Sequence, residues 1–250
     1  MFGVFCKKKI IKTDSQEKFI RRSQIKTVNR QQSIVTDMIY VEGNSYINSF
    51  LVSKYMVTQK DFQKIMGYNP ATMDIGDDIP VNQVKIFEAM LFCNMISERE
   101  GFFPAYKLRK ITKRGERVIE ANVEMVNTNG YRLPTLKEWQ YAASGGNKSN
   151  NYKYSGSNNL DEVGWYSKNV ESWSVKPVGL KKPNELGIYD MSGNIGEMTE
   201  TEENSYFLVC GGNICSREYE CEIKAVNHTL VSPNVKYPYL STGFRLFRSL

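Results

Sequence analysis

The last hundred residues constrain the fold most, because they contain few signals for regular secondary structure. Residues 147–159 are rich in Asn, Ser and Gly, a composition typical of loops. The stretch 213–239 also has few helix or strand signals. Loops this long inside a compact domain are usually functional or fixed by another element. We therefore expect a bound cation, disulfides or aromatic anchors to hold them on a platform built earlier in the chain.

The start of such a platform is visible after residue 37. Residues 38–52 favour a β-hairpin, because two apolar strands flank a Glu-Gly-Asn turn. Thr58 is typical of a helix N-cap, and apolar residues then recur at helical spacing as far as Gly67. The same spacing returns after Val84, and Gly101 ends this second helix.

Three further elements are expected downstream. Residues 105–129 favour two strands with a charged tip between them. Thr135 and Glu138 form the capping-box pattern of a third helix. Residues 243–247 predict a terminal strand whose side chains alternate between two faces.

The charge is concentrated at the N-terminus. Residues 1–36 contain nine Lys or Arg and two acids, a net charge of +7, so the remainder of this +6 chain carries −1. A basic tail of this kind can contact nucleic acid or an anionic membrane. Its composition favours a solvated leader instead. We expect a poorly ordered leader at 1–36, without a nucleic-acid role, and one domain at 37–250.

The start of the sequence does not match a secretory signal. The apolar residues at 2–6 are few, and three lysines follow them rather than precede them. No stretch approaches the length of a transmembrane helix. The sequence therefore predicts a cytoplasmic protein without a membrane span.

Cysteine and histidine limit the metal chemistry. No pair of cysteines has the CxxC spacing of a zinc ribbon, and the single histidine excludes sites that need two or three imidazoles. The residues concerned are Cys6, Cys93, Cys210, Cys215, Cys221 and His228.

Eight motifs in a fixed order resemble the sulfatase-modifying-factor family, also called the formylglycine-generating-enzyme family. The resemblance extends from about residue 37 to the end. It implies an α+β variant of the C-type lectin fold, loop-rich, with two or three helices on a twisted antiparallel sheet. The motifs lie at 50–59, 66–70, 80–84 with 92–94, 130–139, 141–146, 183–197, 211–212 and 243–246.

The family divides by function, and this chain departs from its catalytic pattern. Some members oxidise a sulfatase cysteine to formylglycine, and others display a variable ligand-binding surface without catalysis. Positions that usually hold tryptophan carry Ile86, Gly196 and Met198 here. The resemblance assigns packing and ion-pair roles to Arg132, Glu138, Trp139 and Arg245.

The resemblance also places a thiol pair after the Gly211-Gly212 turn. In catalytic members two cysteines there hold copper(I), a soft ion that prefers thiolates. Cys215 and Cys221 are the candidates, as copper ligands and catalytic residues. Counted from Gly212, however, Cys221 falls on the second ligand position, and Ser216 rather than Cys215 falls on the first.

A cation site is implied at the turn 190–197. Two carboxylates flank a glycine-containing loop there, which suits the oxygen ligands of calcium. By resemblance the calcium ligands are Asp190, Gly193, Ile195 and Glu197. A plain turn, in which Asn194 and Glu197 bond local amides, is the alternative.

Two functions follow. The first is a non-catalytic module that binds a protein or peptide ligand through the loop face at 195–240, where rigid aromatics and short polar groups suit recognition. The second is a copper- and oxygen-dependent oxidase that makes formylglycine. The candidate surface residues are Asn213, Arg217, Tyr219, Asn227, His228 and Tyr237.

Overall fold

The computed structural model describes residues 37–72, 74–204, 206–231 and 242–250, with the backbone alone at 227–231. The predicted leader at 1–36 lies outside these residues, so its boundary stays a prediction. Among the described residues, none of the helices combines the length and hydropathy that a bilayer span requires.

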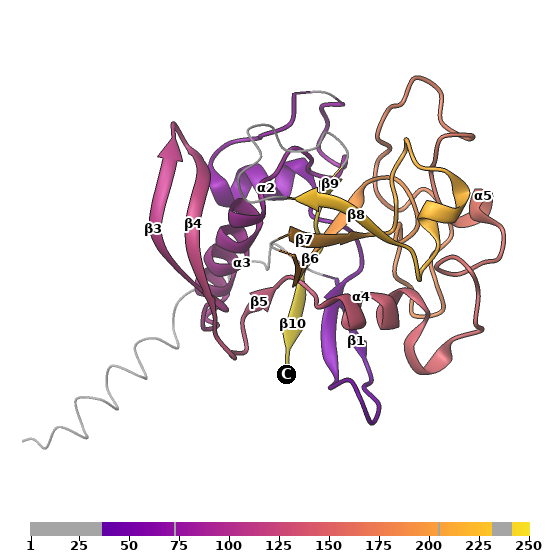
Figure 1. The fold of residues 1–250 in the computed structure, drawn as a ribbon, viewed down its shortest axis with the longest axis horizontal. Coiled ribbons are helices and arrows are strands. Elements are labelled where there is room, and N and C mark those ends of the chain that lie inside the picture. The colour runs from indigo at the N-terminus through magenta and orange to yellow at the C-terminus, as the bar shows by residue number, and fades with distance from the viewer. Residues whose placement is uncertain (1–36, 73, 205, 232–241) are drawn as a thin grey trace, which may run out of the picture. The chain divides into compact units, whose positions relative to one another are not determined.

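The first sheet joins the two ends of the domain. Its antiparallel strands are β1 (Met38–Val41), β2 (Phe50–Ser53), β10 (Phe247–Ser249) and β5 (Tyr131–Arg132), in that spatial order (Figure 1). The predicted hairpin is therefore confirmed, and the C-terminal strand pairs with it.

The three predicted helices form where their caps place them. Helix α2 (Gln59–Met66) begins after Thr58, whose side chain accepts a hydrogen bond from the Asp61 amide. Helix α3 (Ile86–Glu100) ends at Gly101 in the left-handed conformation, and α4 (Leu136–Ala143) begins with the expected capping box. Apolar residues of α2 and α3 share one core with the loop before β10.

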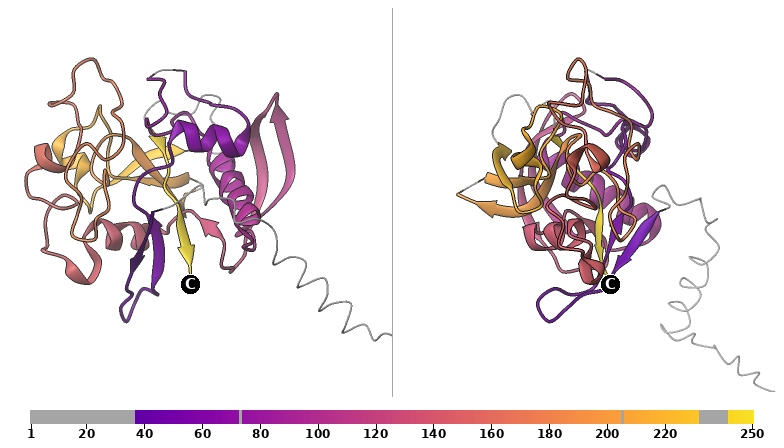
Figure 2. Two further views of the ribbon diagram at one scale, coloured as in Figure 1. Left: turned by 180° about the vertical axis from the view of Figure 1, so that it is seen from behind. Right: turned by 90° about the vertical axis from the view of Figure 1, so that its right-hand side faces the viewer.

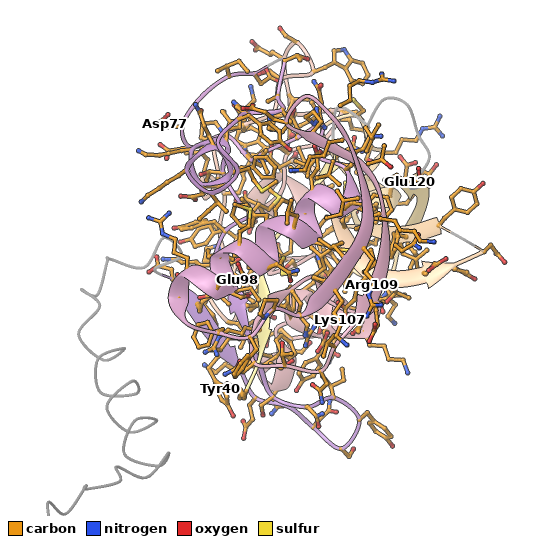
Figure 3. All side chains as sticks on the ribbon, turned by 90° about the vertical axis from the view of Figure 1, so that its left-hand side faces the viewer. Tyr40, Asp77, Glu98, Lys107, Arg109 and Glu120 are labelled. Atoms are coloured by element: carbon orange, nitrogen blue, oxygen red, sulfur yellow. The ribbon has the colours of Figure 1, made fainter. Side chains whose placement is uncertain are left out.

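A two-stranded ribbon covers α3. Strands β3 (Tyr106–Arg114) and β4 (Arg117–Met125) pair antiparallel, as the sequence predicts, and Figure 3 shows them running beside the helix. The side chain of Asn94 fixes the start of β3, because its amide donates to the Tyr106 carbonyl (2.6 Å) and accepts from the Tyr106 amide (3.1 Å).

A second four-stranded sheet was not foreseen. It has the order β8 (Val226–Val231), β7 (Tyr206–Cys210), β6 (Gly196–Glu203), β9 (Thr242–Gly243), and only the β6–β9 pairing is parallel. The sequence does not predict β6 because four of its eight residues are glutamate, which is depleted in strands. The domain therefore has two small sheets and a ribbon instead of one sheet.

The predicted terminal strand is interrupted. Residues 244–246 lie between β9 and β10, and their carbonyls accept from the amides of residue 53, at the end of β2, and residue 57, in the loop after it. Phe244 and Leu246 enter the main core, and Arg245 is buried apart from it. The side chains of residues 244–246 do alternate in direction, but those on both faces are buried.

The long loops are held by small cores and side-chain hydrogen bonds. Residues 147–195 include only the 3₁₀ turn η1 (Gly146–Lys148) and the short helix α5 (Leu160–Val163) (Figures 1 and 2). Buried Asn184 donates to the Ala142 carbonyl (2.8 Å) and accepts from the Ile188 amide (3.1 Å). The four described cysteines are free thiols, so disulfides between them contribute nothing.

Candidate binding face and thiol region

A buried ion pair occupies the middle of the second sheet. Arg245 Nε donates to Glu197 Oε2 (2.6 Å), and Arg245 Nη2 donates to Glu197 Oε1 (2.7 Å). Trp139 Nε1 also donates to Glu197 Oε2 (2.8 Å). Since all three side chains are essentially without solvent exposure, the carboxylate is fully satisfied by protein donors. The packing roles expected of these residues are thus what the geometry shows.

That pairing bears on the calcium prediction. A cation at Glu197 would have to displace a guanidinium, whereas Gly193 and Ile195 are expected to contribute only their backbone carbonyls. Gly193 turns with φ +83° directly against the Trp165 carbonyl. In the part of the chain that the structure describes, no three His, Cys, Asp or Glu side chains gather at one point, which concerns sites built from side chains and not one completed by backbone carbonyls. The carboxylate of Glu197 does not fit a calcium ligand here, and calcium binding stays a prediction.

Asp190 is the exception in this turn. Its Oδ2 accepts from the Gly179 amide (2.7 Å), whereas its Oδ1 is buried without a partner. Burial raises the pKa of Asp190 to about 6, opposed by the Gly179 bond and by Arg245. This carboxyl is therefore half-satisfied and titrates near neutrality.

The two candidate copper ligands occupy different environments. Cys221 ends η2 (Glu218–Cys221) and is fully buried with Tyr154, Leu160 and Tyr166, whereas Cys215 is exposed. Burial, reinforced by Glu220, raises the pKa of Cys221 to about 12. The thiol is accordingly protonated at neutral pH when no metal is bound, and a cation binding there would have to displace its proton.

Ser216 takes the place beside Cys221. The Asn213 amide donates to Ser216 Oγ (3.1 Å). The Cys221 sulfur lies against the preceding residue, Gly212, where an added Cβ would come within 2.6 Å of it. The hydroxyl thus stands where the family's first thiolate is expected, and a hydroxyl in place of one thiolate leaves copper(I) a single sulfur ligand there.

An exposed face surrounds this region. Arg217 and Tyr219 are exposed, with Arg217 Nη1 3.5 Å from the Tyr219 hydroxyl. The neighbouring loop is bonded to this face, because the Ser167 amide donates to the Ser216 carbonyl (3.2 Å) and Lys168 Nζ pairs with Glu218 (2.6 Å). We call residues 213–220 with 166–168 the η2 face.

The structure brings half of the predicted surface residues together. Asn213, Arg217 and Tyr219 lie on the η2 face. Asn227 and His228 lie on β8, where only the backbone is described, and Tyr237 lies outside the described residues. The residues that sequence reasoning missed are Ser167 and Lys168, because their contribution depends on contacts across fifty positions of chain.

A cavity elsewhere is small. It measures about 160 Å³ and lies beside residues 53–58, below the 300–1,000 Å³ usual for small-molecule sites. Its lining includes Lys54, whose ammonium lies 5.3 Å from the Tyr55 ring centre.

The comparison with known families decides the classification. A family model described as the sulfatase-modifying factor enzyme 1-like domain matches residues 28–250. The chain belongs to this family. A relative, chaperone protein LppX of Paenibacillus barcinonensis, is 40% identical over 74% of this chain and 76% of its own.

Solved structures share the fold of this chain. Treponema denticola variable protein 1 is 25% identical, with a TM-score of 0.68 over 86% of this chain and 92% of its own. CarF is 24% identical, with a TM-score of 0.72 over 87% and 99%. PvdO of Pseudomonas aeruginosa is 17% identical, with a TM-score of 0.58 over 81% of each chain. The last two show the fold alone.

Proposed function

We propose that this sulfatase-modifying-factor domain is a non-catalytic module that binds a partner polypeptide through the η2 face. The observation that carries the proposal is a surface of exposed Arg217 and Tyr219 whose backbone is fixed from two sides. The Arg217 amide donates to Glu220 Oε2 (2.6 Å), the Glu220 amide donates to the Arg217 carbonyl (3.0 Å), and the loop at 167 bonds to residue 216. Tyr and Arg on a rigid support are the side chains that dominate protein interfaces.

The relative supports the kind of partner. A protein 40% identical to this chain is named a chaperone, and chaperones bind other polypeptides. We infer that the partner of this chain is a polypeptide that has not reached its final fold. The η2 face is suited to it, because Tyr219 supplies contact area and Arg217 supplies hydrogen-bond donors.

The oxidase is the second candidate, and the residues present do not favour it. Formylglycine formation in the family uses a thiolate pair, which would hold copper(I) and supply the site where oxygen is reduced. Here the two positions carry Ser216 and Cys221, and the thiol of Cys221 has a raised pKa.

One experiment separates the two functions. The full chain is mixed with a chemically denatured test protein, and aggregation is followed by light scattering on dilution. We expect suppression by the wild type and at least about tenfold weaker suppression by Arg217→Ala/Tyr219→Ala, in keeping with the loss of two interface anchors. Oxygen uptake with a sulfatase-type cysteine peptide in the presence of copper would instead establish the oxidase. Equal activity of wild type and double variant in the scattering assay would remove the η2 face from the proposal.

A further inference from the structure

Two loops far apart in sequence are joined at one end of the domain. The Asp74 carboxylate accepts from Ser174 Oγ (2.7 Å) and from the Val175 amide (3.0 Å). A second bond joins the Val178 amide to the Asp78 carbonyl (2.9 Å). The loop at 74–79 is also tied to α2, because Gln59 Nε2 donates to the Asp74 carbonyl (2.8 Å). Both loops can be followed in Figures 1 and 2, beyond α2 and before β6.

Three large apolar side chains are exposed on these joined loops. Ile75 is 66% exposed, Trp173 is 62% exposed and Leu180 is 59% exposed. Each lies within two residues of one of the hydrogen bonds that join the loops. A single exposed apolar side chain is ordinary, but several on one fixed support are typical of an interaction site. We call residues 74–78 with 170–180 the Trp173 platform.

The backbone at Trp173 is held in an unusual conformation. Trp173 has φ +55° and Ser172 has φ +64°, a region that costs a bulky side chain about 1–2 kcal/mol. The bonds from Asp74 to residues 174 and 175 fix the chain immediately after this point. The result is that the indole ring stays in solvent instead of folding back onto the core.

The platform is acidic. It contains the four acids Asp74, Asp77, Asp78 and Glu171 against one lysine, Lys176, and Asp78 and Glu171 are exposed. Asp77 pairs with Lys60 (3.1 Å), the ion pair that the structure gives for this group of acids. Lys176 and the following Lys181 are directed at another ring, since Lys181 Nζ lies 3.9 Å from the Trp165 ring centre and Lys176 Nζ lies 6.0 Å from it.

We propose that the Trp173 platform docks an extended segment of a partner polypeptide that carries a bulky apolar side chain next to Lys or Arg. The apolar side chain packs against Trp173 and Ile75, and the cation is attracted by Asp78 and Glu171. This inference rests on the proposed function only in taking the partner to be a polypeptide. It adds the chemistry that the partner must have.

Labelled synthetic peptides of equal length test the platform by fluorescence anisotropy with the full chain. One peptide alternates Leu and Lys, one replaces Leu by Ser, and one replaces Lys by Glu. We expect the first to bind at least about tenfold more tightly than the other two, because each lacks one of the two complementary features. Equal binding of the Leu/Lys and Ser/Lys peptides, or of the Leu/Lys and Leu/Glu peptides, would overturn the proposal.

Variants locate the binding. Trp173→Gly is expected to weaken the Leu/Lys peptide about tenfold without lowering thermal stability, because glycine relieves the positive φ. Asp78→Asn/Glu171→Gln is expected to weaken it and to reduce its salt dependence. Tyr46→Ala, at a 92% exposed ring on the β1–β2 hairpin, is the matched control and should change nothing.

The outcomes also separate this inference from the proposed function. If Trp173→Gly loses peptide binding and Arg217→Ala/Tyr219→Ala retains it, the Trp173 platform is supported regardless of the result of the scattering assay on the η2 face. Retention in Trp173→Gly overturns the platform, and the scattering assay with Arg217→Ala/Tyr219→Ala then still decides the η2 face.

Discussion

Arg245 and Glu197 form a bidentate ion pair in which neither side chain is in contact with solvent. Arg245 also donates from Nη2 to the Tyr189 carbonyl (2.7 Å) and from Nη1 to the Ser53 carbonyl (3.1 Å). One guanidinium therefore connects β2, the turn before β6, and β6 itself. The pair explains how a loop-rich domain keeps its two sheets in a fixed relationship.

Removing one partner of this pair should be strongly destabilising. We expect Arg245→Met to lower the free energy of unfolding by about 3–5 kcal/mol, because Glu197 would be left buried and uncompensated. Urea unfolding measures the change. Lys107→Met is the matched control, since its pair with Glu124 (2.8 Å) is exposed and such pairs contribute less than about 1 kcal/mol. Similar losses in the two variants would contradict the role assigned to Arg245.

The half-satisfied carboxyl of Asp190 predicts a pH effect. Its pKa is raised from 3.8 to about 6 in the folded chain, so the folded state binds this proton more tightly than the unfolded state. The cost of ionisation is absent below pH 4, grows from there to pH 6, and is complete above it, on the order of 3 kcal/mol at most. The melting temperature of Asp190→Asn should therefore equal that of the wild type at pH 4 and exceed it at pH 8.

The same variant tests the calcium prediction. If a cation completes Asp190 Oδ1, added calcium will raise the melting temperature of the wild type more than that of Asp190→Asn. Equal response in both proteins would remove Asp190 from the predicted ligand set, as the pairing of Glu197 with Arg245 already does for Glu197.

Ser216 predicts that the thiol pair can be restored. We expect Ser216→Cys to place a second sulfur beside Cys221, because Ser216 Oγ accepts from the Asn213 amide and the Cys221 sulfur lies against Gly212, the residue before it. The variant should then form a disulfide on oxidation or bind copper(I), measured by competition with a colorimetric copper(I) chelator. Cys215→Ser in the same background should leave the result unchanged. One equivalent of thiolate-bound copper in the wild type would show that the present pair suffices.

Asn184 predicts how the loops are fixed. Its Nδ2 donates to the Ala142 carbonyl and to Ser155 Oγ (3.1 Å), and its Oδ1 accepts from the Leu186 amide (3.0 Å). Asn184→Ala leaves these buried groups without partners and should cost on the order of 3 kcal/mol. Limited proteolysis should show faster cleavage near residues 147–159. Asn122→Ala, at an exposed position of β4, should behave like the wild type.

Local sequence signals determined the helices. Thr58, Thr135 and Glu138 cap their helices as their chemistry dictates, and Gly101 ends α3 in the left-handed conformation. These features depend on residues within one or two helical turns, so a single sequence contains them. The α+β fold was implied by the resemblance of the ordered motifs to the family.

Tertiary contacts decided everything in the last hundred residues. Strand β6 forms despite its acidic composition because Met198 and Thr199 are buried against β7 and the core, and burial outweighs strand propensity. The sequence by itself supplied Glu197 and Arg245 as separate motif residues. Only the folded chain brings them together across 48 positions, because sequence spacing does not encode this pairing. The Glu197 carboxylate, which the turn alone would leave available to a cation, is bonded to Arg245 as a result.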